Sequence, residues 1–134
     1  MSMHRILVAY DGSEPARRAL ERAAEFASAM NATLTVVSVV PLHPDRVPVD
    51  PGDETAHEKA LAEATRYLAG RGLSSSTLEA TGDPGPAIVQ VAEQGSFDAI
   101  VVGSRGRGTA ARLVLGSVSE YVATHARATV IVVH

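Results

Sequence analysis

Residues 6–13, Ile-Leu-Val-Ala-Tyr-Asp-Gly-Ser, pass from a short apolar run into a turn, and the pattern that decides the fold begins there. The run is rich in branched residues and too short for a helix, which is typical of a strand buried on both faces of a parallel sheet. Ser13 and Pro15 then supply an N-cap and a first-turn proline for a helix over Ser13–Met30. A strand, a loop and a helix are therefore predicted in direct succession.

The same succession recurs along the chain. Strands are predicted at Ile6–Tyr10, Leu34–Val40, Ser75–Ala80, Ala99–Val102 and Thr129–Val133, and further helices at Glu54–Ala69, Pro84–Gln94 and Arg112–His125. This alternation predicts a parallel sheet with helices on both faces and right-handed crossovers. The segment Pro41–Gly52 holds four prolines and no periodic pattern, and we interpret it as a flap. In such sheets ligands bind beyond the carboxyl ends of the strands, where strand order reverses.

The composition excludes several classes of protein. The 134 residues suit one domain, 1–134, and contain no cysteine, which excludes disulfides and thiolate metal sites. A net charge of −3 and scarce aromatic residues argue against nucleic acid as a partner. No apolar run approaches the ~20 residues of a membrane helix, and no signal peptide is evident. We therefore expect a cytoplasmic protein without membrane contact.

The strongest functional signal follows the predicted fourth strand. Three glycines and a serine there have the spacing Gly-x2-Gly-x9-Gly-Ser, at Gly103, Gly106, Gly116 and Ser117. Glycines let main-chain N–H groups approach a ligand, and successive N–H groups form an anion-binding concavity. The same region adds hydroxyls and positive charges, at Ser117, Ser119, Arg105, Arg107 and Arg112. These features indicate a polyphosphate site, the alternative being ordinary turn glycines between a strand and a helix.

Two familiar phosphate motifs do not fit this loop. A Walker A loop needs Gly-Lys-Ser/Thr, and the only lysine is Lys59. The Rossmann fingerprint places its glycines after the first strand of the unit. The loop after the first strand instead offers Asp11, which either accepts a hydrogen bond from a nucleoside or helps to cap the following helix. Val39, at the end of the second strand, is either an apolar wall for a base or plain core.

Three stretches of the chain resemble the universal stress protein family: residues 6–13, the Thr-Gly-Asp-Pro of residues 81–84, and the Val-Val-Gly-Ser-Arg-Gly-Arg-Gly of residues 101–108. In that family the pattern Gly-x2-Gly-x9-Gly-Ser/Thr marks the ATP-binding subgroup. The resemblance implies a three-layer α/β/α fold of the adenine nucleotide alpha hydrolase type. Its five-stranded parallel sheet is expected to have the order 3-2-1-4-5.

The resemblance also implies the ligand and its contacts. We expect ATP with Mg²⁺, the metal reached weakly by Ser117 through the nucleotide. Asp11 is expected at the adenosine, Val39 by the adenine, and the glycine-rich segments at the phosphates. The full expected nucleotide-binding set is Ala9, Tyr10, Asp11, Gly12, Ser13, Val39, Gly103, Ser104, Arg105, Gly106, Arg107, Gly108, Gly116, Ser117, Val118 and Ser119.

Many members of the family pair as homodimers through the last strand. The strand within residues 128–134 is very apolar, and an apolar edge favours association unless it is covered. Pairing with a second copy around a twofold axis covers it, and a helix of the same chain is the alternative. The five histidines, His4, His43, His57, His125 and His134, lack metal-ligand spacing and are expected at the surface.

The expected function is a nucleotide-dependent regulatory module of a stress response, read by protein partners that the sequence does not identify, with no catalytic residues. The alternative is slow ATP cleavage, by hydrolysis or adenylate transfer, although no base stands beside the glycine loop. A phosphoacceptor receiver domain is excluded, because Asp11 is alone in its loop and no lysine follows the fifth strand. A dimeric interaction module without a ligand is disfavoured by the intact glycine pattern.

Overall fold

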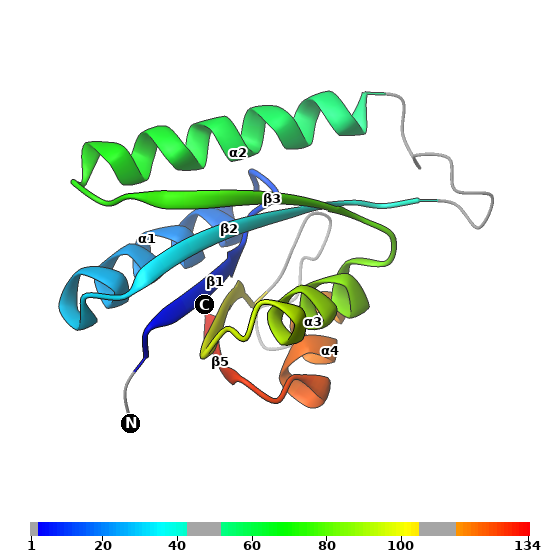
Figure 1. The fold of residues 1–134 in the computed structure, drawn as a ribbon. Helices are drawn as coiled ribbons and strands as arrows, with labels where there is room; N and C mark the ends of the chain where they lie inside the picture. Colours follow the sequence, from blue (N-terminus) through cyan, green and yellow to red (C-terminus); the bar gives the residue numbers. More distant parts are fainter. Residues whose placement is uncertain (1–2, 43–51, 105–114) are drawn as a thin grey trace.

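Strands and helices alternate along the described part of the chain. The computed structural model describes residues 3–42, 52–104 and 115–134 (Figure 1). The strands are β1 (Arg5–Ala9), β2 (Thr33–Val40), β3 (Ser75–Thr81), β4 (Ala99–Gly103) and β5 (Thr129–Val133). The helices are α1 (Glu14–Met30), α2 (Asp53–Gly70), α3 (Pro84–Gln94) and α4 (Ser117–His125). The predicted alternation is confirmed, whereas residues 43–51 of the expected flap lie outside the described residues.

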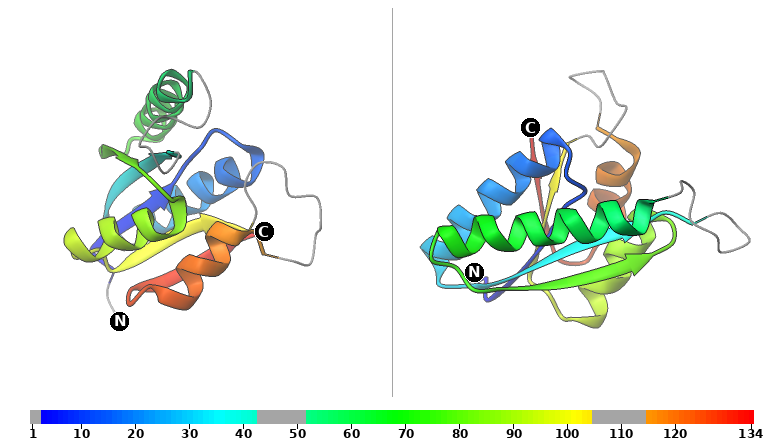
Figure 2. Two further views of the ribbon diagram at one scale, coloured as in Figure 1. Left: turned by 90° about the vertical axis from the view of Figure 1, so that its right-hand side faces the viewer. Right: turned by 90° about the horizontal axis from the view of Figure 1, so that it is seen from above.

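The five strands form one parallel sheet in the order β3-β2-β1-β4-β5. Helices α1 and α2 cover one face and α3 and α4 cover the other (Figures 1 and 2). The three-layer fold and the strand order 3-2-1-4-5 are thereby confirmed. Within the described ranges, no helix has both the length and the apolar character needed to cross a membrane.

The central strands are buried on both faces, as their continuous apolar runs predicted. Val36 and Val37 are neighbours in β2 and both have no exposed surface. Val36 packs in the cluster under α1 and α2, and Val37 packs in the cluster under α3 and α4. The edge strand β3 is mostly exposed, and its Leu78 keeps 43% of its surface accessible.

Helix α1 begins and packs as its sequence predicts. The Ser13 hydroxyl caps it by accepting a hydrogen bond from the Ala16 N–H at 3.3 Å, and Pro15 lies in the first turn. One face consists largely of small buried side chains, which let the helix approach the sheet closely: Ala16, Ala19, Ala23, Ala24 and Ala27. The N-terminus of α1 is thereby held against the carboxyl end of the sheet.

Helix α4 starts later than predicted. The expected start was Arg112, but residues 115–116 are not helical, and the helix begins at Ser117. Gly116 is the N-cap, with an extended backbone at φ −66° and ψ 161°. Glycine is a poor helix former, so Gly116 marks the start of α4, which the apolar pattern alone did not predict. Residues 112–114 lie outside the described part of the chain.

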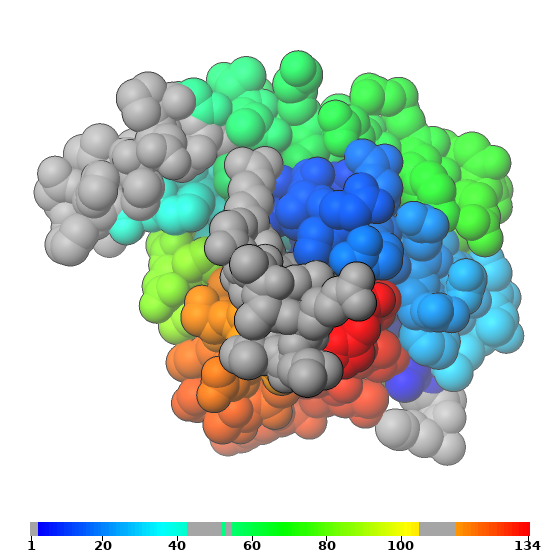
Figure 3. Space-filling view, turned by 180° about the vertical axis from the view of Figure 1, so that it is seen from behind, coloured from blue at the N-terminus to red at the C-terminus, as the bar shows by residue number. Residues whose placement is uncertain are grey.

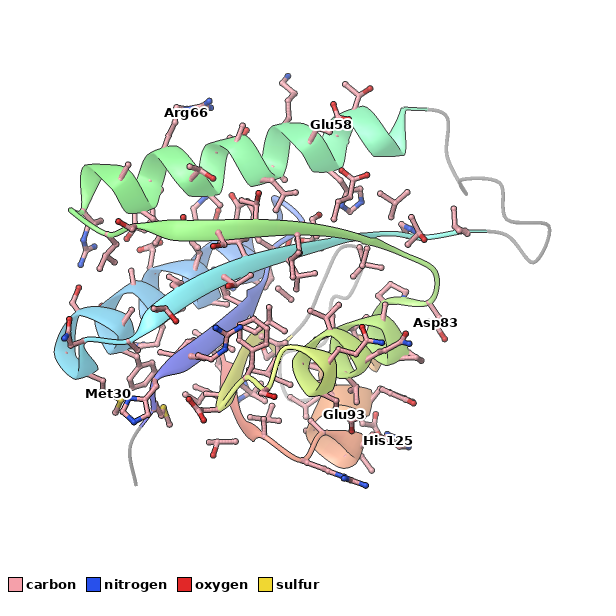
Figure 4. The ribbon with its side chains drawn as sticks, in the orientation of Figure 1. Met30, Glu58, Arg66, Asp83, Glu93 and His125 are labelled. Atoms are coloured by element: carbon pink, nitrogen blue, oxygen red, sulfur yellow. The ribbon has the colours of Figure 1, made fainter. Side chains whose placement is uncertain are left out.

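The expectation of surface histidines is wrong at one position. His57, on α2, is only 8% exposed, and its Nδ1 forms a hydrogen bond with the hydroxyl of Ser38 on β2. Ser38 is 1% exposed, so the two polar groups satisfy one another inside the layer between sheet and helix. Glu58 and Arg66 lie on the opposite, exposed side of α2 (Figure 4). His4, His125 and His134 are exposed, as expected.

Candidate functional site

The candidate site lies between β1 and β4, where the order of the strands in the sheet reverses. β1 and β4 are adjacent and parallel. From β1 the chain continues into α1 on one face, and from β4 it leads toward α4 on the other (Figure 2). In open parallel sheets this reversal opens a crevice beyond the carboxyl ends of the two strands. Ala9 and Gly103 are the last residues of β1 and β4, so they mark the edge of the sheet where this rule places a ligand.

The loop after β1 is held by its own hydrogen bonds. The Tyr10 N–H donates to the Val37 carbonyl at 2.9 Å, which extends the sheet by one residue. The Asp11 carboxylate accepts a hydrogen bond from the Ser13 N–H at 2.9 Å. Gly12 between them has φ +81°, a left-handed conformation that favours glycine. Asp11 therefore holds the backbone of the N-cap residue Ser13, whereas the cap of α1 itself is the Ser13 hydroxyl.

The Tyr10 side chain faces the core between the sheet, α1 and α2. It is 2% exposed and packs in the cluster that includes Ala16 and Ala64. Burial raises the pKa of the Tyr10 phenol, the charge of Arg17 opposes that rise, and Glu63 adds to it. Tyr10 can therefore offer only main-chain groups to a ligand at the crevice.

The end of β4 lies against the start of α1. A Cβ atom placed on Gly103 would be 2.7 Å from the Pro15 carbonyl oxygen, a contact that real Cβ atoms do not make. Gly103 therefore has a packing reason to be glycine, independent of any ligand. The sequence indicated Pro15 only as a helix start. No local sequence pattern could have predicted its contact with Gly103, which is far away in the sequence.

Ser104 links three elements just beyond β4. Its N–H donates to the carbonyl of Val133, at the end of β5, at 2.8 Å. Its own carbonyl accepts from the Gly116 N–H at 2.7 Å and from the Ser119 hydroxyl at 2.8 Å. The Gly116 N–H and the Ser119 hydroxyl, expected as ligand donors, are bound to the protein itself in this structure.

The N-terminus of α4 takes part in these hydrogen bonds through Gly116 and Ser119. The first helical bond runs from the Glu120 N–H to the Gly116 carbonyl at 2.9 Å. A helix leaves its first N–H groups without partners inside the helix, and in α4 these include the N–H groups of Ser117 and Val118. Ser117 is exposed and Val118 is half-buried. The start of α4 thus presents N–H groups, a hydroxyl and the positive end of a helix dipole.

The remaining expected residues divide into two groups. Val39 is 8% exposed and packs with Ile88 and Val89 under α3, as the core interpretation requires. Four expected phosphate contacts, Arg105, Gly106, Arg107 and Gly108, lie outside the described residues. Figure 3 shows that the loop after β1 and the start of α1 (blue) share one face of the molecule with the end of β5 (red) and with α4 (orange).

The donors at this face suit an anion better than a cation. Within residues 3–42, 52–104 and 115–134, no group of three or more histidine, cysteine or acidic residues could hold a metal ion. The groups at the end of β4 and the start of α4 are main-chain N–H groups and serine hydroxyls, of which those of Ser104, Gly116 and Ser119 already donate within the protein. The fold is therefore a doubly wound α/β fold, and main-chain N–H groups and serine hydroxyls lie at its topological switch point, where such folds bind ligands.

The chain belongs to the universal stress protein family, whose model matches residues 3–134. It is 37% identical over 133 residues to a universal stress protein of Thermus aquaticus, covering 96% of each chain. A universal stress protein solved in complex with cAMP is 29% identical, with a TM-score of 0.78, over 100% of this chain and 98% of that one. The Archaeoglobus fulgidus universal stress protein in complex with dAMP is 26% identical, with a TM-score of 0.80, over 100% of both.

Proposed function

We propose that residues 1–134 form one cytoplasmic universal stress protein domain of the ATP-binding subgroup, acting as a nucleotide-dependent regulator of a stress response. The observation that supports this most strongly is the convergence of two helix N-termini at the end of β4. Pro15, in the first turn of α1, lies against Gly103, and the N-cap of α4, Gly116, donates to Ser104. Helix N-termini favour anions through free N–H groups and the helix dipole.

The phosphates are assigned to the α4 side of the crevice. Ser117 and Val118 supply N–H groups there, and the Ser117 hydroxyl is the one protein group proposed to reach Mg²⁺ held by the phosphates. The glycine pattern through Gly106 and Gly108, with Arg105 and Arg107, supplies the rest of the proposed phosphate contacts. Mg²⁺ commonly keeps several waters and takes few protein ligands beside a phosphate, so the Ser117 hydroxyl and the phosphates are the ligands proposed for it here.

The adenosine is assigned to the β1 side of the crevice. Main-chain groups of Ala9, Tyr10 and Gly12, with the polar side chains of Asp11 and Ser13, stand at the end of β1. Val39 contributes an apolar edge from β2. The two solved relatives that contain cAMP and dAMP support an adenine nucleotide as the class of ligand. The family's glycine pattern is what favours ATP within that class.

The regulatory role includes a homodimer through β5. β5 lies at the edge of the sheet, and its Val130, Ile131 and Val132 are only half-buried. Pairing with a second copy would cover this apolar edge. We propose binding and regulation in place of catalysis, because the chain offers no base beside the glycine pattern, and slow ATP cleavage is the competing activity.

Calorimetry on nucleotide-stripped protein tests the proposal. We expect ATP with Mg²⁺ to bind wild type, and Gly106→Val to weaken binding at least tenfold by filling the space that the phosphates need. Gly70→Ala, at the distant end of α2, is the matched control and should bind as wild type does. Absence of ATP binding, in a sample whose extract contains no nucleotide, would contradict the proposal. Rapid ADP or AMP release would favour the enzyme instead.

A further inference from the structure

Ser119 is a buried polar residue with two acceptors close to its hydroxyl. It lies on α4 and is 2% exposed. The hydroxyl is 2.8 Å from the carbonyl oxygen of Ser104 and 3.0 Å from that of Gly116. A serine hydroxyl carries one hydrogen, so these two carbonyls share it in a three-centre hydrogen bond. Its donor is therefore used before any ligand arrives.

The two acceptors belong to two segments of the glycine pattern that are separated by residues 105–115. Ser104 directly follows β4, and Gly116 directly precedes α4. They are also joined to one another, since the Gly116 N–H donates to the Ser104 carbonyl at 2.7 Å. The Ser119 hydroxyl therefore lies where the end of a strand and the start of a helix meet.

This junction is attached to the sheet. The Ser104 N–H donates to the Val133 carbonyl at 2.8 Å. This hydrogen bond holds the junction at the end of β5. Ser104 is itself 4% exposed, which keeps water from competing for these bonds. Groups that position a ligand are most accurate when rigid elements and buried hydrogen bonds support them.

We propose that Ser119 is a positioning residue that joins the end of β4 to the N-terminus of α4 and does not itself contact the nucleotide. Its hydroxyl fixes the direction in which the N–H groups of Ser117 and Val118, in the first turn of α4, point. The expected effect of Ser119 on nucleotide affinity rests on the proposed function. The junction itself is a property of the nucleotide-free protein and can be tested without a ligand.

Amide hydrogen exchange of nucleotide-free protein is the first measurement. Ser119→Ala should speed exchange of the Gly116 N–H about fivefold, the effect of losing one net hydrogen bond at a local opening. The N–H groups of Tyr10 and Ala126, bonded to Val37 and Val122, should keep wild-type rates. Ser119→Thr keeps a hydroxyl and should restore the Gly116 rate, whereas Ser117→Ala, at an exposed position, should not change it.

Nucleotide titration is the second measurement. Ser119→Ala should weaken ATP binding about fivefold, and Ser119→Thr should recover it. If Ser119→Ala weakens ATP binding while leaving Gly116 exchange at the wild-type rate, Ser119 is a direct ligand contact and the inference is overturned. Unchanged Gly116 exchange in Ser119→Ala overturns it even if no nucleotide binds. Faster exchange together with no ATP binding to wild type supports the junction and rejects the proposed function.

Discussion

Gly103, at the end of β4, lies so close to Pro15 in the first turn of α1 that a Cβ atom on it would stand 2.7 Å from the Pro15 carbonyl oxygen. The contact fixes how near the N-terminus of α1 comes to the carboxyl end of β4. The same glycine begins the Gly-x2-Gly-x9-Gly-Ser pattern. One residue therefore serves the packing of the fold and stands at the proposed phosphate site.

Substitution of Gly103 by alanine should destabilise the protein because backbone must move to make room. We expect the free energy of unfolding in urea to fall by about 1–3 kcal/mol, the usual cost of overpacking. Gly70→Ala is the control, because nothing lies within 4 Å of its added Cβ and alanine is the better helix former. An equally stable Gly103→Ala protein would show that α1 and β4 do not approach as described.

The Ser38–His57 hydrogen bond should contribute measurably to stability. Ser38→Ala leaves a buried imidazole nitrogen without its partner, so we expect a loss of about 1–3 kcal/mol in urea unfolding. Ser76→Ala, an exposed serine on β3, should change stability by less than about 0.5 kcal/mol. A double-mutant cycle with His57→Phe should show coupling of about 0.5–3 kcal/mol. Additive effects would mean that the two residues do not interact.

Asp98 should make stability depend on acid pH. Its Oδ2 accepts hydrogen bonds from the His4 and Arg5 N–H groups at 2.8 Å each, and these bonds hold the pKa of the carboxyl below its usual value. The unfolded chain binds this proton more readily, with a pKa of about 3.9. The carboxylate therefore stabilises the fold above about pH 4, and the contribution is lost as the pH falls through the lowered pKa.

Comparison of wild type with Asp98→Asn measures this contribution. The difference between their urea midpoints should be largest near neutral pH and should shrink as the pH falls below about 4. Glu93→Gln, which removes an exposed carboxylate at the end of α3, provides the matched control. A wild-type to Asp98→Asn difference that stays constant over this range would contradict the lowered pKa.

The β5 edge should carry the proposed dimer. Val132→Lys places a charge on a half-buried apolar edge position, so we expect the dimer dissociation constant to rise at least tenfold in sedimentation. Thr77→Lys, on the exposed strand β3 at the opposite edge, should leave it unchanged. Wild type that sediments as a monomer at micromolar concentration would reject the dimer.

The sequence predicts most of the fold because its signals are local. Pro84–Gln94 and Thr129–Val133 have the same bounds in sequence and structure, since proline, glycine and runs of branched residues mark element ends within a few positions. The sequence did not predict the start of α4, because apolar residues continue on the N-terminal side of Gly116, whose extended backbone makes it the N-cap. Packing and hydrogen bonding across the fold decided that boundary.

The candidate site is predictable only in outline. Gly103, Ser104, Gly116 and Ser119 are brought together at the end of β4, although the sequence does not reveal that three of them bind one another. The contact between Gly103 and Pro15 and the pairing of Ser38 with His57 depend on how helices cross the sheet. Such contacts join residues distant in sequence and leave no periodic signal.

The most direct test of the nucleotide site is a titration of nucleotide-stripped, ¹⁵N-labelled protein with ATP and Mg²⁺, followed amide by amide by NMR. We expect the largest shift changes at Gly12, Gly103 and Ser117, around the carboxyl ends of β1 and β4. Gly72 and Ser96, at the opposite end of the sheet, should stay unchanged. No shift change at saturating ATP, or changes centred on Gly72 and Ser96, would contradict the proposed nucleotide site.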